Sequence, residues 1–463
     1  MRLACSSLRS LRLAGALAII VVLLSSGLAP LRPAVHAAGG LHAHQPVTLT
    51  FGVEFTDAPT TQAAETYLIK PFEKQYPWIH IKLVQQSGAS GIDHYLKTSL
   101  EAGSGPDVFD ENGPSWMGPF ADAHAVLNLD PYAKEYGWDK KILPFAYKAG
   151  LYHGHLYSLP TETETLVLWY NKTIFNKYHW SPPTTFDQMV TLSKAIQSKG
   201  LIPFAFGSSD CKPCWEWWES YALNAYVGPQ MMYKVLTGKM PWTSPLVAQA
   251  FTKLKTLWDD NFINSKESAS LSTNDSWGLF GAQKAVMKME GTWGFSPGLI
   301  FNYAKGFNWG VATLPAWRPG VPAWPPIGVG EVDAINAHTK HPQEAALFLN
   351  WFFHSPSFNG QWAYTLASTW VPPLKYTAAD FPKTTNPLFQ QVLLNNEQAM
   401  ASGKAGYLAW SAWPAGTEQY MWSNAESVLY GTLSIPKFLQ GMEKTFQGEQ
   451  ASGSLPTVPP PAS

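Results

Sequence analysis

The sequence predicts an α/β fold with open, mostly parallel sheets. Between residues 47 and 110, runs of alternating apolar residues take turns with runs whose apolar residues recur at helical spacing. A second series of the same kind begins near residue 185. Strands that alternate with helices pair in parallel through right-handed crossovers. Each series therefore predicts one sheet with helices on both faces, and 463 residues are enough for two such cores.

The composition is that of a globular protein and excludes two kinds of partner. Hydrophobic residues make up 46% of the chain and charged residues 14%. Because the formal net charge is −1, there is no electrostatic basis for binding nucleic acid or an anionic membrane surface. The 21 Trp residues are unusual. So many Trp residues indicate that some of them form an aromatic surface, on which a flat, apolar face of a ligand can stack.

Residues 1–37 are expected to be a cleaved signal peptide. Basic residues precede the apolar run Leu13–Leu24, which is too short to span a membrane, and small residues follow up to Ala37. Cleavage after Ala37 would release an exported protein, whereas an uncleaved membrane anchor is the alternative. Cys5 precedes the apolar run, so it is not placed as the lipid-attached cysteine that would follow such a run.

The first series predicts the strands and helices of one sheet. Strands are expected at Val47–Val53, Ile79–Val84 and Gly105–Asp110, with helices at Thr61–Gln75 and Ile92–Ala102. Ligands of open parallel sheets lie at the carboxyl ends of the strands. Several polar and aromatic residues follow these strands and are therefore candidates for ligand contacts: Glu54, Phe55, Asp57, Asp110, Glu111, Asn112 and Trp116.

Residues 154–172 place a carboxylate in an otherwise β-prone stretch. His155–Leu159 predicts a short strand that stops at Pro160, and Thr165–Tyr170 predicts a second strand. Glu164 lies at the start of that second run. An isolated acid there is unfavourable unless it faces water or a polar ligand, so we expect Glu164 to bind a ligand.

The second series begins with a capped helix. Thr185 has Gln188 at the capping-box distance, and Gly200 ends the helix. The segments expected after it are a strand at Ile202–Phe206, helices at Trp215–Tyr226, Pro245–Trp258, Leu388–Met400, Thr417–Tyr430 and Ile435–Phe446, and a disordered tail from Gly448. Glu216 or Glu219, on the first of these helices, is a further candidate for a ligand contact.

The mature chain has two cysteines, Cys211 and Cys214, three positions apart. In an exported protein this spacing favours a small disulfide loop at the start of the helix Trp215–Tyr226. A redox-active pair is an alternative, because thiols at this spacing often have a lowered pKa. Free thiols or a metal site also stay open, although no further metal ligands lie nearby in the sequence.

Motifs along the chain resemble those of the extracellular solute-binding proteins of family 1, the maltose-binding-like carbohydrate receptors of ABC transporters. The similarity extends over residues 46–446. The segments that carry it, in order, are Gly105–Asp110 with Trp116, Pro160 with Tyr170–Lys172, Phe280–Trp293, and Gly328–Ile335. Within the third segment, Trp293 matches a sugar-stacking tryptophan of the family, and Gly291 is expected to let the backbone pass close to a ligand.

The resemblance implies a two-lobed, periplasmic-binding-protein-like fold with three hinge crossovers, near 160–164, 311–315 and 368–373. Each lobe would be an open, mostly parallel sheet covered by helices on both faces. The expected lobes are 46–160 with 314–370, and 161–313 with 371–447, followed by a disordered tail at 448–463. Such lobes close around a ligand by hinge motion.

The same resemblance implies a function. The exported protein, in the periplasm or at the outer cell surface, would capture a sugar or oligosaccharide between its lobes and deliver it to the permease subunits of an ABC importer. We expect it to act as a monomer, without catalysis, cofactor or metal.

The candidate ligand contacts follow from the shape of a pyranose, which has a belt of hydroxyls and two flatter C–H faces. Carboxylates bind the belt and Trp rings cover the faces. The acids expected to bind hydroxyls are Glu54, Asp57, Asp110, Glu111 and Glu164. The aromatic residues expected to stack are Trp116, Trp215, Trp293, Trp370 and Trp413. Core packing is the alternative for each Trp, and a helix cap or surface charge is the alternative for each acid.

Two other functions stay open. A glycosidase would use two of these acids at a defined separation. A receptor for a polyamine or another cationic solute would use an acidic, aromatic site through cation–π contacts. A Ser-His-Asp signature, a phosphate-binding loop and a His-Glu-x-x-His zinc motif are not found in the sequence.

Overall fold

The computed structural model describes residues 44–355, 359 and 371–462. The chain divides into the units Met1–His44 and Gln45–Ser463, and the fold described here is that of the second unit. The predicted signal peptide, its cleavage site and Trp370 lie outside the described residues.

The first sheet has five strands in the order β2-β1-β3-β12-β6. Their bounds are β1 (Val47–Val53), β2 (Ile79–Gln85), β3 (Val108–Glu111), β6 (Ser158–Pro160) and β12 (Val332–Ile335). β1 pairs in parallel with β2 and β3, whereas β12 runs antiparallel to both of its neighbours. Four strands therefore point the same way, as the alternation of strands and helices predicts, and one is reversed.

The second sheet follows the order β10-β7-β9-β8, with β11 also paired to β7. Its strands are β7 (Thr163–Asn171), β8 (Ile202–Phe204), β9 (Ala285–Gly291), β10 (Trp309–Ala312) and β11 (Ile327–Val329). β7 runs antiparallel to β9, β10 and β11, and β8 is parallel to β9. The reversed strand of each sheet is joined to the other sheet by a short link without a helix, whereas a parallel pairing needs a long crossover.

The links between the sheets correct one predicted crossover. The chain leaves the first sheet at Thr161–Glu162 and returns at Gly330–Glu331. The expected return at 311–315 is wrong, because β10 and β11 both pair with β7 and keep this stretch in the second sheet. The two links are hydrogen-bonded to each other: Thr161 N donates to Glu331 O over 3.0 Å, and Gly330 N donates to Glu162 O over 3.1 Å.

Part of the third predicted crossover lies outside the described residues. Within 371–373, Val371 is buried in the core of the first sheet, as is Leu374 just beyond. Helix α17 (Pro387–Ala401) follows and packs Phe389 on Phe295, with ring centroids 5.3 Å apart. The chain therefore passes to the helices of the second sheet beyond residue 373. The predicted boundaries of the two lobes stay a prediction.

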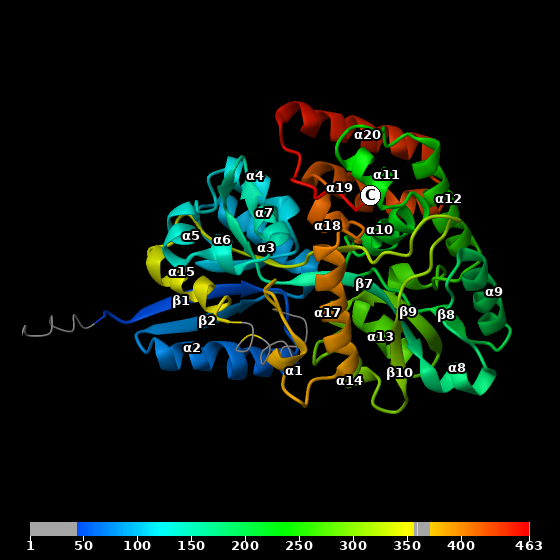
Figure 1. Cartoon of the computed structure of the whole chain (residues 1–463), viewed down its shortest axis with the longest axis horizontal. Coiled ribbons are helices and arrows are strands. Elements are labelled where there is room, and N and C mark those ends of the chain that lie inside the picture. Colours follow the sequence, from blue (N-terminus) through cyan, green and yellow to red (C-terminus); the bar gives the residue numbers. More distant parts are fainter. Residues whose placement is uncertain (1–43, 356–358, 360–370, 463) are drawn as a thin grey trace, which may run out of the picture. The chain divides into compact units, whose positions relative to one another are not determined.

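Helices cover the first sheet on both faces (Figure 1). They are α1 (Ala58–Ala63), the π-helix η1 (Ala64–Ile69), α2 (Lys70–Gln75), α3 (Gly88–Glu101), the 3-10 turn η2 (Pro114–Trp116), α4 (Met117–Asp122), α5 (Asp130–Tyr136), α6 (Trp138–Lys141), α7 (Pro144–Ala149) and α15 (Pro342–Trp351). A small hairpin joins β4 (Leu151–Tyr152) to β5 (His155–Leu156). Phe348 of α15 packs between Phe51 and Phe72, with ring centroids 5.3 and 5.0 Å away, and so anchors α15 and α2 to the strands.

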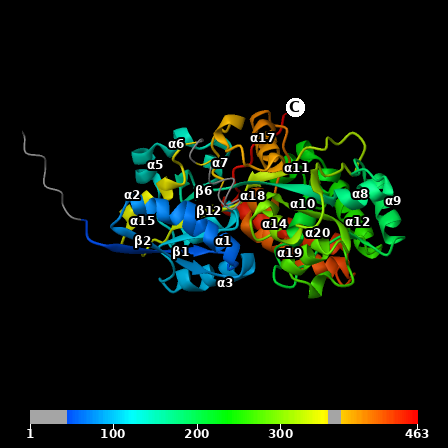
Figure 2. The same ribbon diagram turned by 90° about the horizontal axis from the view of Figure 1, so that it is seen from below.

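A second set of helices surrounds the other sheet (Figures 1 and 2). This set comprises α8 (Lys172–Tyr178), α9 (Phe186–Gln197), α10 (Trp215–Tyr226), α11 (Pro229–Leu236), α12 (Pro245–Asp259), η3 (Ser268–Ser270), α13 (Thr273–Gly281), η4 (Thr292–Phe295), α14 (Ile300–Tyr303), α18 (Ala409–Ala412), α19 (Ala415–Leu429) and α20 (Ile435–Ser452). Thr185 caps α9 as predicted, accepting from Gln188 N. The predicted α/β class is confirmed, with sheets that are mixed rather than purely parallel.

The C-terminal segment corrects the prediction of a disordered tail. Helix α20 continues through Ser452, and the segment after it lies against the second core, where Leu455 and Val458 are partly buried. Pro459 O accepts a hydrogen bond from Tyr407 Oη over 2.9 Å. The Gly, Ser and Pro residues of this segment disfavour helix and strand. The segment nevertheless packs on the second core in an extended form, because Leu455 and Val458 bury apolar surface there.

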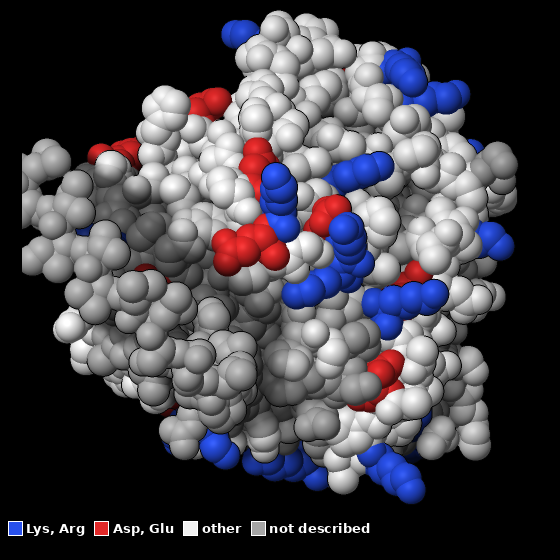
Figure 3. All heavy atoms as spheres, turned by 60° about the vertical axis from the view of Figure 1, so that its left-hand side comes forward, with Lys and Arg blue, Asp and Glu red and all other residues white. Residues whose placement is uncertain are grey.

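On the face shown in Figure 3, acidic side chains gather near the middle with basic side chains beside them. Within the described part of the chain, no helix has the length and apolar character needed to cross a membrane.

Candidate functional site

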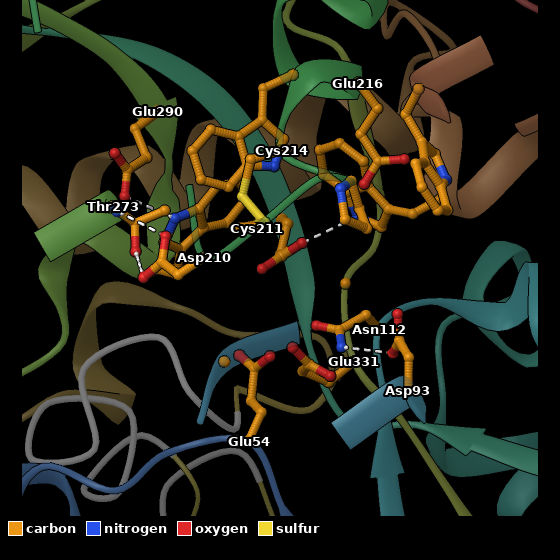
Figure 4. A pocket seen from close by; sticks show the side chains of 18 of the residues that line it. Glu54, Asp93, Asn112, Asp210, Cys211, Cys214, Glu216, Thr273, Glu290 and Glu331 are labelled. Atoms are coloured by element: carbon orange, nitrogen blue, oxygen red, sulfur yellow. Dashed lines mark hydrogen bonds between the residues drawn. A yellow bond between two sulfur atoms is a disulfide. The ribbon is translucent and has the colours of Figure 1, made fainter. Parts of the chain in front are cut away.

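One cavity takes its lining from elements of both sheets and from the two links between them. Glu54, Asp93 and Asn112 lie on one side with Glu331, and Glu216 and Glu290 lie opposite them (Figure 4). Glu54 directly follows β1 and Asn112 directly follows β3. The carboxyl ends of these parallel strands therefore open onto the cavity, as expected for an open α/β sheet.

Six tryptophans line the cavity, and three of them form a continuous wall. Trp293 lies between the other two, with its ring centroid 5.0 Å from that of Trp217 and 5.9 Å from that of Trp410. The remaining three are Trp116, Trp277 and Trp422. Trp217 and Trp293 are only partly buried, so that their rings are available to stack on a ligand.

Hydrogen bonds hold the wall in place. Glu290 Oε1 accepts from Trp293 Nε1 over 3.0 Å and from Trp277 Nε1 over 2.9 Å. Trp410 Nε1 donates to Glu164 Oε2 over 3.0 Å. Because the indole N–H groups of Trp293 and Trp410 are satisfied in this way, these two rings can present their apolar faces to the cavity.

Gly291 serves this wall rather than the passage of backbone past a ligand. A Cβ at this position would lie 1.9 Å from Cζ3 of Trp293. The φ of Gly291 is −84°, which other residues adopt readily. Glycine is therefore required here for space, since any side chain would displace the Trp293 ring.

Nine carboxylates line the same cavity. They are Glu54, Asp93, Glu162, Glu164, Asp210, Glu216, Glu290, Glu331 and Glu418. Among the described residues that line it, there is no Lys, Arg or His. Two lysines outside the lining contact lining residues: Lys97 stands 3.5 Å above the Trp116 ring, and Lys288 forms a buried ion pair with Glu290.

Burial and mutual repulsion raise the pKa of these acids. Burial raises the pKa of Glu164 to about 8, and the charge of Glu54 adds to the shift while the bond from Trp410 opposes it. Burial and then the charge of Asp93 raise the pKa of Glu54 to about 7. For Glu162 and Glu331, burial followed by the charges of neighbouring carboxylates holds the pKa well above the usual value.

These shifts predict that the free protein loses stability as the pH rises. The folded state keeps its protons up to about pH 7 at Glu54 and about pH 8 at Glu164, whereas the unfolded chain loses them near 4.5. Their stabilising contribution is therefore complete below pH 4.5 and is lost as the pH rises through 7 and 8. Urea denaturation between pH 5 and 8 should show the free energy of unfolding falling by several kcal/mol, because one pKa unit is worth about 1.4 kcal/mol.

Glu164→Gln should flatten that dependence, since the amide does not titrate. Glu101→Gln is the matched control, because Glu101 is exposed at the end of α3 and outside the cavity lining. An unfolding free energy that is constant or rises over this range would contradict the assignment of protonated acids at the cavity.

Three of the buried acids converge at the links between the sheets. Glu162 and Glu164 come from the first link and the start of β7, and Glu331 comes from the return link. One oxygen of each lies within 4.8 Å of the other two. Their side chains are 2%, 5% and 7% exposed, which makes three desolvated acceptors around one point. This group can hold a cation, either a metal ion or an ammonium group.

The structure brings five of the predicted candidates together at the cavity: Glu54, Asn112, Trp116, Glu164 and Trp293. Glu54 and Trp116 follow strands of the first sheet, Glu164 comes from β7, and Trp293 follows β9. Glu216, one of two alternatives on α10, also lines the cavity, whereas Glu219 is buried behind it.

Two predicted stacking residues belong to the core instead. Trp215 is fully buried against Phe206 and Trp258, and Trp413 is fully buried against Trp242. Neither ring reaches the cavity, so neither can stack on a ligand there. Trp370, also predicted to stack, lies outside the described residues.

Three predicted acids likewise lie away from the cavity lining. Asp57 is the N-cap of α1 and accepts from Thr60 N over 2.9 Å. Asp110 is buried in β3 and pairs with Asp333 of β12. Glu111 is also buried, and its pKa is raised first by burial and second by the charge of Asp93. Asp110 still acts on the site by its charge, which raises the pKa of Glu162 and of Glu331.

Several cavity residues were not predicted from the sequence. Glu162 and Glu331 lie inside motifs that the sequence analysis singled out, so their closeness to a crossover was the available signal. Glu290 is on β9, inside the motif Phe280–Trp293, and carried a similar signal. Asp93, Asp210, Trp217, Glu418 and Trp422 come from helices and a loop outside these motifs. Their local sequence resembles that of ordinary surface or core positions and carries no such signal.

Cys211 and Cys214 form a disulfide at the rim of the cavity, with Cα atoms 5.4 Å apart. Cys214 is the N-cap of α10, so the bridge fixes the loop before Trp215. We predict that thiol titration of the exported protein detects no free thiols, and that reduction lowers the unfolding midpoint only modestly, because so short a loop restricts the unfolded chain little. Two reactive thiols in the native protein would contradict this prediction.

Comparison with known proteins agrees with this geometry. The sequence model of the family described as bacterial extracellular solute-binding protein matches residues 57–355. The multiple sugar-binding protein of Streptococcus mutans is 27% identical over 311 residues, which cover 61% of this chain and 66% of that protein. The maltotriose-binding protein of Pyrococcus abyssi is 28% identical over 291 residues, covering 62% of this chain and 59% of that protein.

Solved structures show the same fold. A chitin oligosaccharide binding protein superposes with a TM-score of 0.74 at 22% identity, covering 88% of this chain and 99% of that one. Maltose-bound T. maritima MalE3 superposes with a TM-score of 0.72 at 20% identity, covering 87% and 99%. Because the family model matches more than half of the sequence, this chain belongs to the bacterial extracellular solute-binding proteins.

Proposed function

We propose that this protein is the substrate-binding component of an ABC importer and that it captures a sugar or oligosaccharide in the cavity. The main support is the combination of the wall Trp217–Trp293–Trp410 with carboxylates drawn from both sheets. Flat indole faces match the C–H faces of a pyranose, and carboxylate oxygens match its hydroxyls. The names of the multiple sugar-binding and maltotriose-binding relatives support the same class of ligand.

The proposal includes how the ligand is taken up and released. The protein would be exported after cleavage behind Ala37, would act as a monomer in the periplasm or at the outer cell surface, and would pass its ligand to the permease subunits of the importer. The links Thr161–Glu162 and Gly330–Glu331 would serve as the hinge, since the chain crosses between the sheets there. A ligand that contacts both sides of the cavity binds the closed form better and so drives closure.

The proposed role is binding without catalysis. The matched family and the structural neighbours are substrate-binding proteins. The raised pKa values of Glu54 and Glu164 have a sufficient cause in burial and crowding, and so they do not require an acid–base function. The bound sugar should therefore leave chemically unchanged.

One sample tests binding, closure and the absence of catalysis together. Small-angle scattering should show the radius of gyration falling when a binding sugar is added, because the hinge closes around it. Chromatography of the same sample after long incubation should recover the sugar intact. Hydrolysed sugar would favour a glycosidase, and tight binding without compaction would contradict the proposed hinge.

A further inference from the structure

The cavity offers hydrogen-bond acceptors far more than donors. Ionised carboxylates only accept, and four side-chain N–H groups of its lining already donate to carboxylates. Trp293 and Trp277 donate to Glu290, Trp410 donates to Glu164, and Asn112 Nδ2 donates to Asp93 Oδ1 over 3.3 Å. A neutral sugar hydroxyl both donates and accepts, so it would use only half of its capacity against such a lining.

The ionisable side chains of the described lining are all acidic. Glu290 is neutralised by Lys288, whose Nζ lies 2.5 Å from its Oε2. Lys97 acts on Asp93 and Glu111 from behind the Trp116 ring. No cation of the described lining faces the group of Glu162, Glu164 and Glu331. In the free protein, burial and crowding keep these acids protonated, whereas a cation beside them lowers their pKa, so that they ionise and bind it.

Two oxygens in that group have no hydrogen-bond partner among the described residues: Oε1 of Glu162 and Oε2 of Glu331. Both side chains are more than nine-tenths buried, and both line the cavity. An ammonium group has three N–H donors, no acceptor and one positive charge. It therefore matches three converging carboxyl groups in number and in hydrogen-bond direction, and its charge is opposite in sign to theirs.

We propose that the ligand is an amino sugar, or an oligosaccharide that carries one, whose ammonium group is bound by Glu162, Glu164 and Glu331. This inference rests on the proposed carbohydrate binding and names the class of carbohydrate. Trp410 connects the two halves of the site, because it donates to Glu164 and its ring lies 5.9 Å from that of Trp293. The sugar ring would stack on Trp293, and the indole faces would add cation–π attraction to the amine.

Matched pairs of hexoses test the proposal. Glucosamine, galactosamine and mannosamine each differ from glucose, galactose and mannose by an ammonium group in place of one hydroxyl. At a pH of about 6.5, calorimetry should show the amino sugar binding at least about tenfold more tightly than its partner in every pair that binds, as expected for charge-assisted hydrogen bonds. Raising the salt from about 0.05 M to about 0.5 M should reduce that ratio, because charge attraction is screened.

Variants locate the amine. Glu331→Gln and Glu162→Gln keep the size of the side chain and remove its charge, so each should lower the ratio of amino-sugar to neutral-sugar affinity by about tenfold. Glu101→Gln is the control, because Glu101 is exposed and outside the lining, and should leave the ratio unchanged. The ratio is a readout that general destabilisation would not move, since both sugars bind the same folded protein.

The outcomes separate this inference from the proposed function. Neutral hexoses binding as tightly as their amines would overturn the amino-sugar inference and leave carbohydrate binding intact. Binding of spermidine with no hexose bound would overturn both. Stabilisation by calcium chloride alone, with no preference for amines, would assign the three acids to a metal ion and overturn the inference as well.

Discussion

Replacing Gly330 with alanine is expected to disrupt ligand binding by displacing Glu164. A Cβ at Gly330 would lie 2.2 Å from Cδ and 2.5 Å from Oε2 of Glu164. The carboxyl group must then move, and it loses its 3.0 Å bond from Trp410 Nε1. We expect calorimetry to show affinity falling by about 1.5–3 kcal/mol, the range for a hydrogen bond to a charged group.

The design separates this effect from damage to the backbone. Gly306→Ala is the matched control, because a Cβ there meets no atom within 4 Å. In the background of Glu164→Ala, which removes the atoms that clash, Gly330→Ala should cost little further affinity. Such strong non-additivity is the signature of two residues that act through one contact. Additive losses from the two substitutions would contradict the proposed role of Gly330.

Replacing Trp293 with alanine is expected to weaken sugar binding by about 1–3 kcal/mol, the scale of one stacked aromatic in a binding hot spot. Trp293 is the middle ring of the wall, so its loss also removes the support of Trp217 and Trp410. Gly291→Ala should have a similar effect by a different route, because its Cβ would occupy the space of the Trp293 ring.

The control for Trp293 is Trp180→Ala. Trp180 stacks on Tyr178 with ring centroids 4.7 Å apart and lies outside the cavity lining, so sugar affinity should not change. Thermal unfolding should accompany each titration to show that the variants are folded. Unchanged affinity in both Trp293→Ala and Gly291→Ala would move the sugar to another surface.

The fold class depended on short-range patterns, which is why the sequence was sufficient to predict it. Alternating and helical periodicities are read within about ten residues, and they located β1, β2, β7, α9, α10 and α12. The second crossover was misplaced because β10 and β11 have the composition of strands in either sheet. Only their pairing with β7 decides to which sheet they belong.

The site residues show the same limit. Glu54 and Trp116 were predicted because they follow strands whose ends must open onto a shared edge, and Glu164 because an acid in a β-prone run needs a polar partner. Trp215 and Trp217 lie two positions apart on α10, so they point to nearly opposite sides of the helix. The sequence does not state which side faces the cavity, and the structure assigns Trp217 to it and Trp215 to the core.

The sequence by itself determined the family, the two α/β series and the chemical character of the site, which is rich in acids and tryptophans. Only the tertiary structure decided which of these residues meet. Asp93, Glu216 and Glu418 lie on three helices far apart in the chain and reach one cavity. Their convergence depends on long-range packing of whole helices and sheets, because no local pattern encodes the position of one helix relative to another.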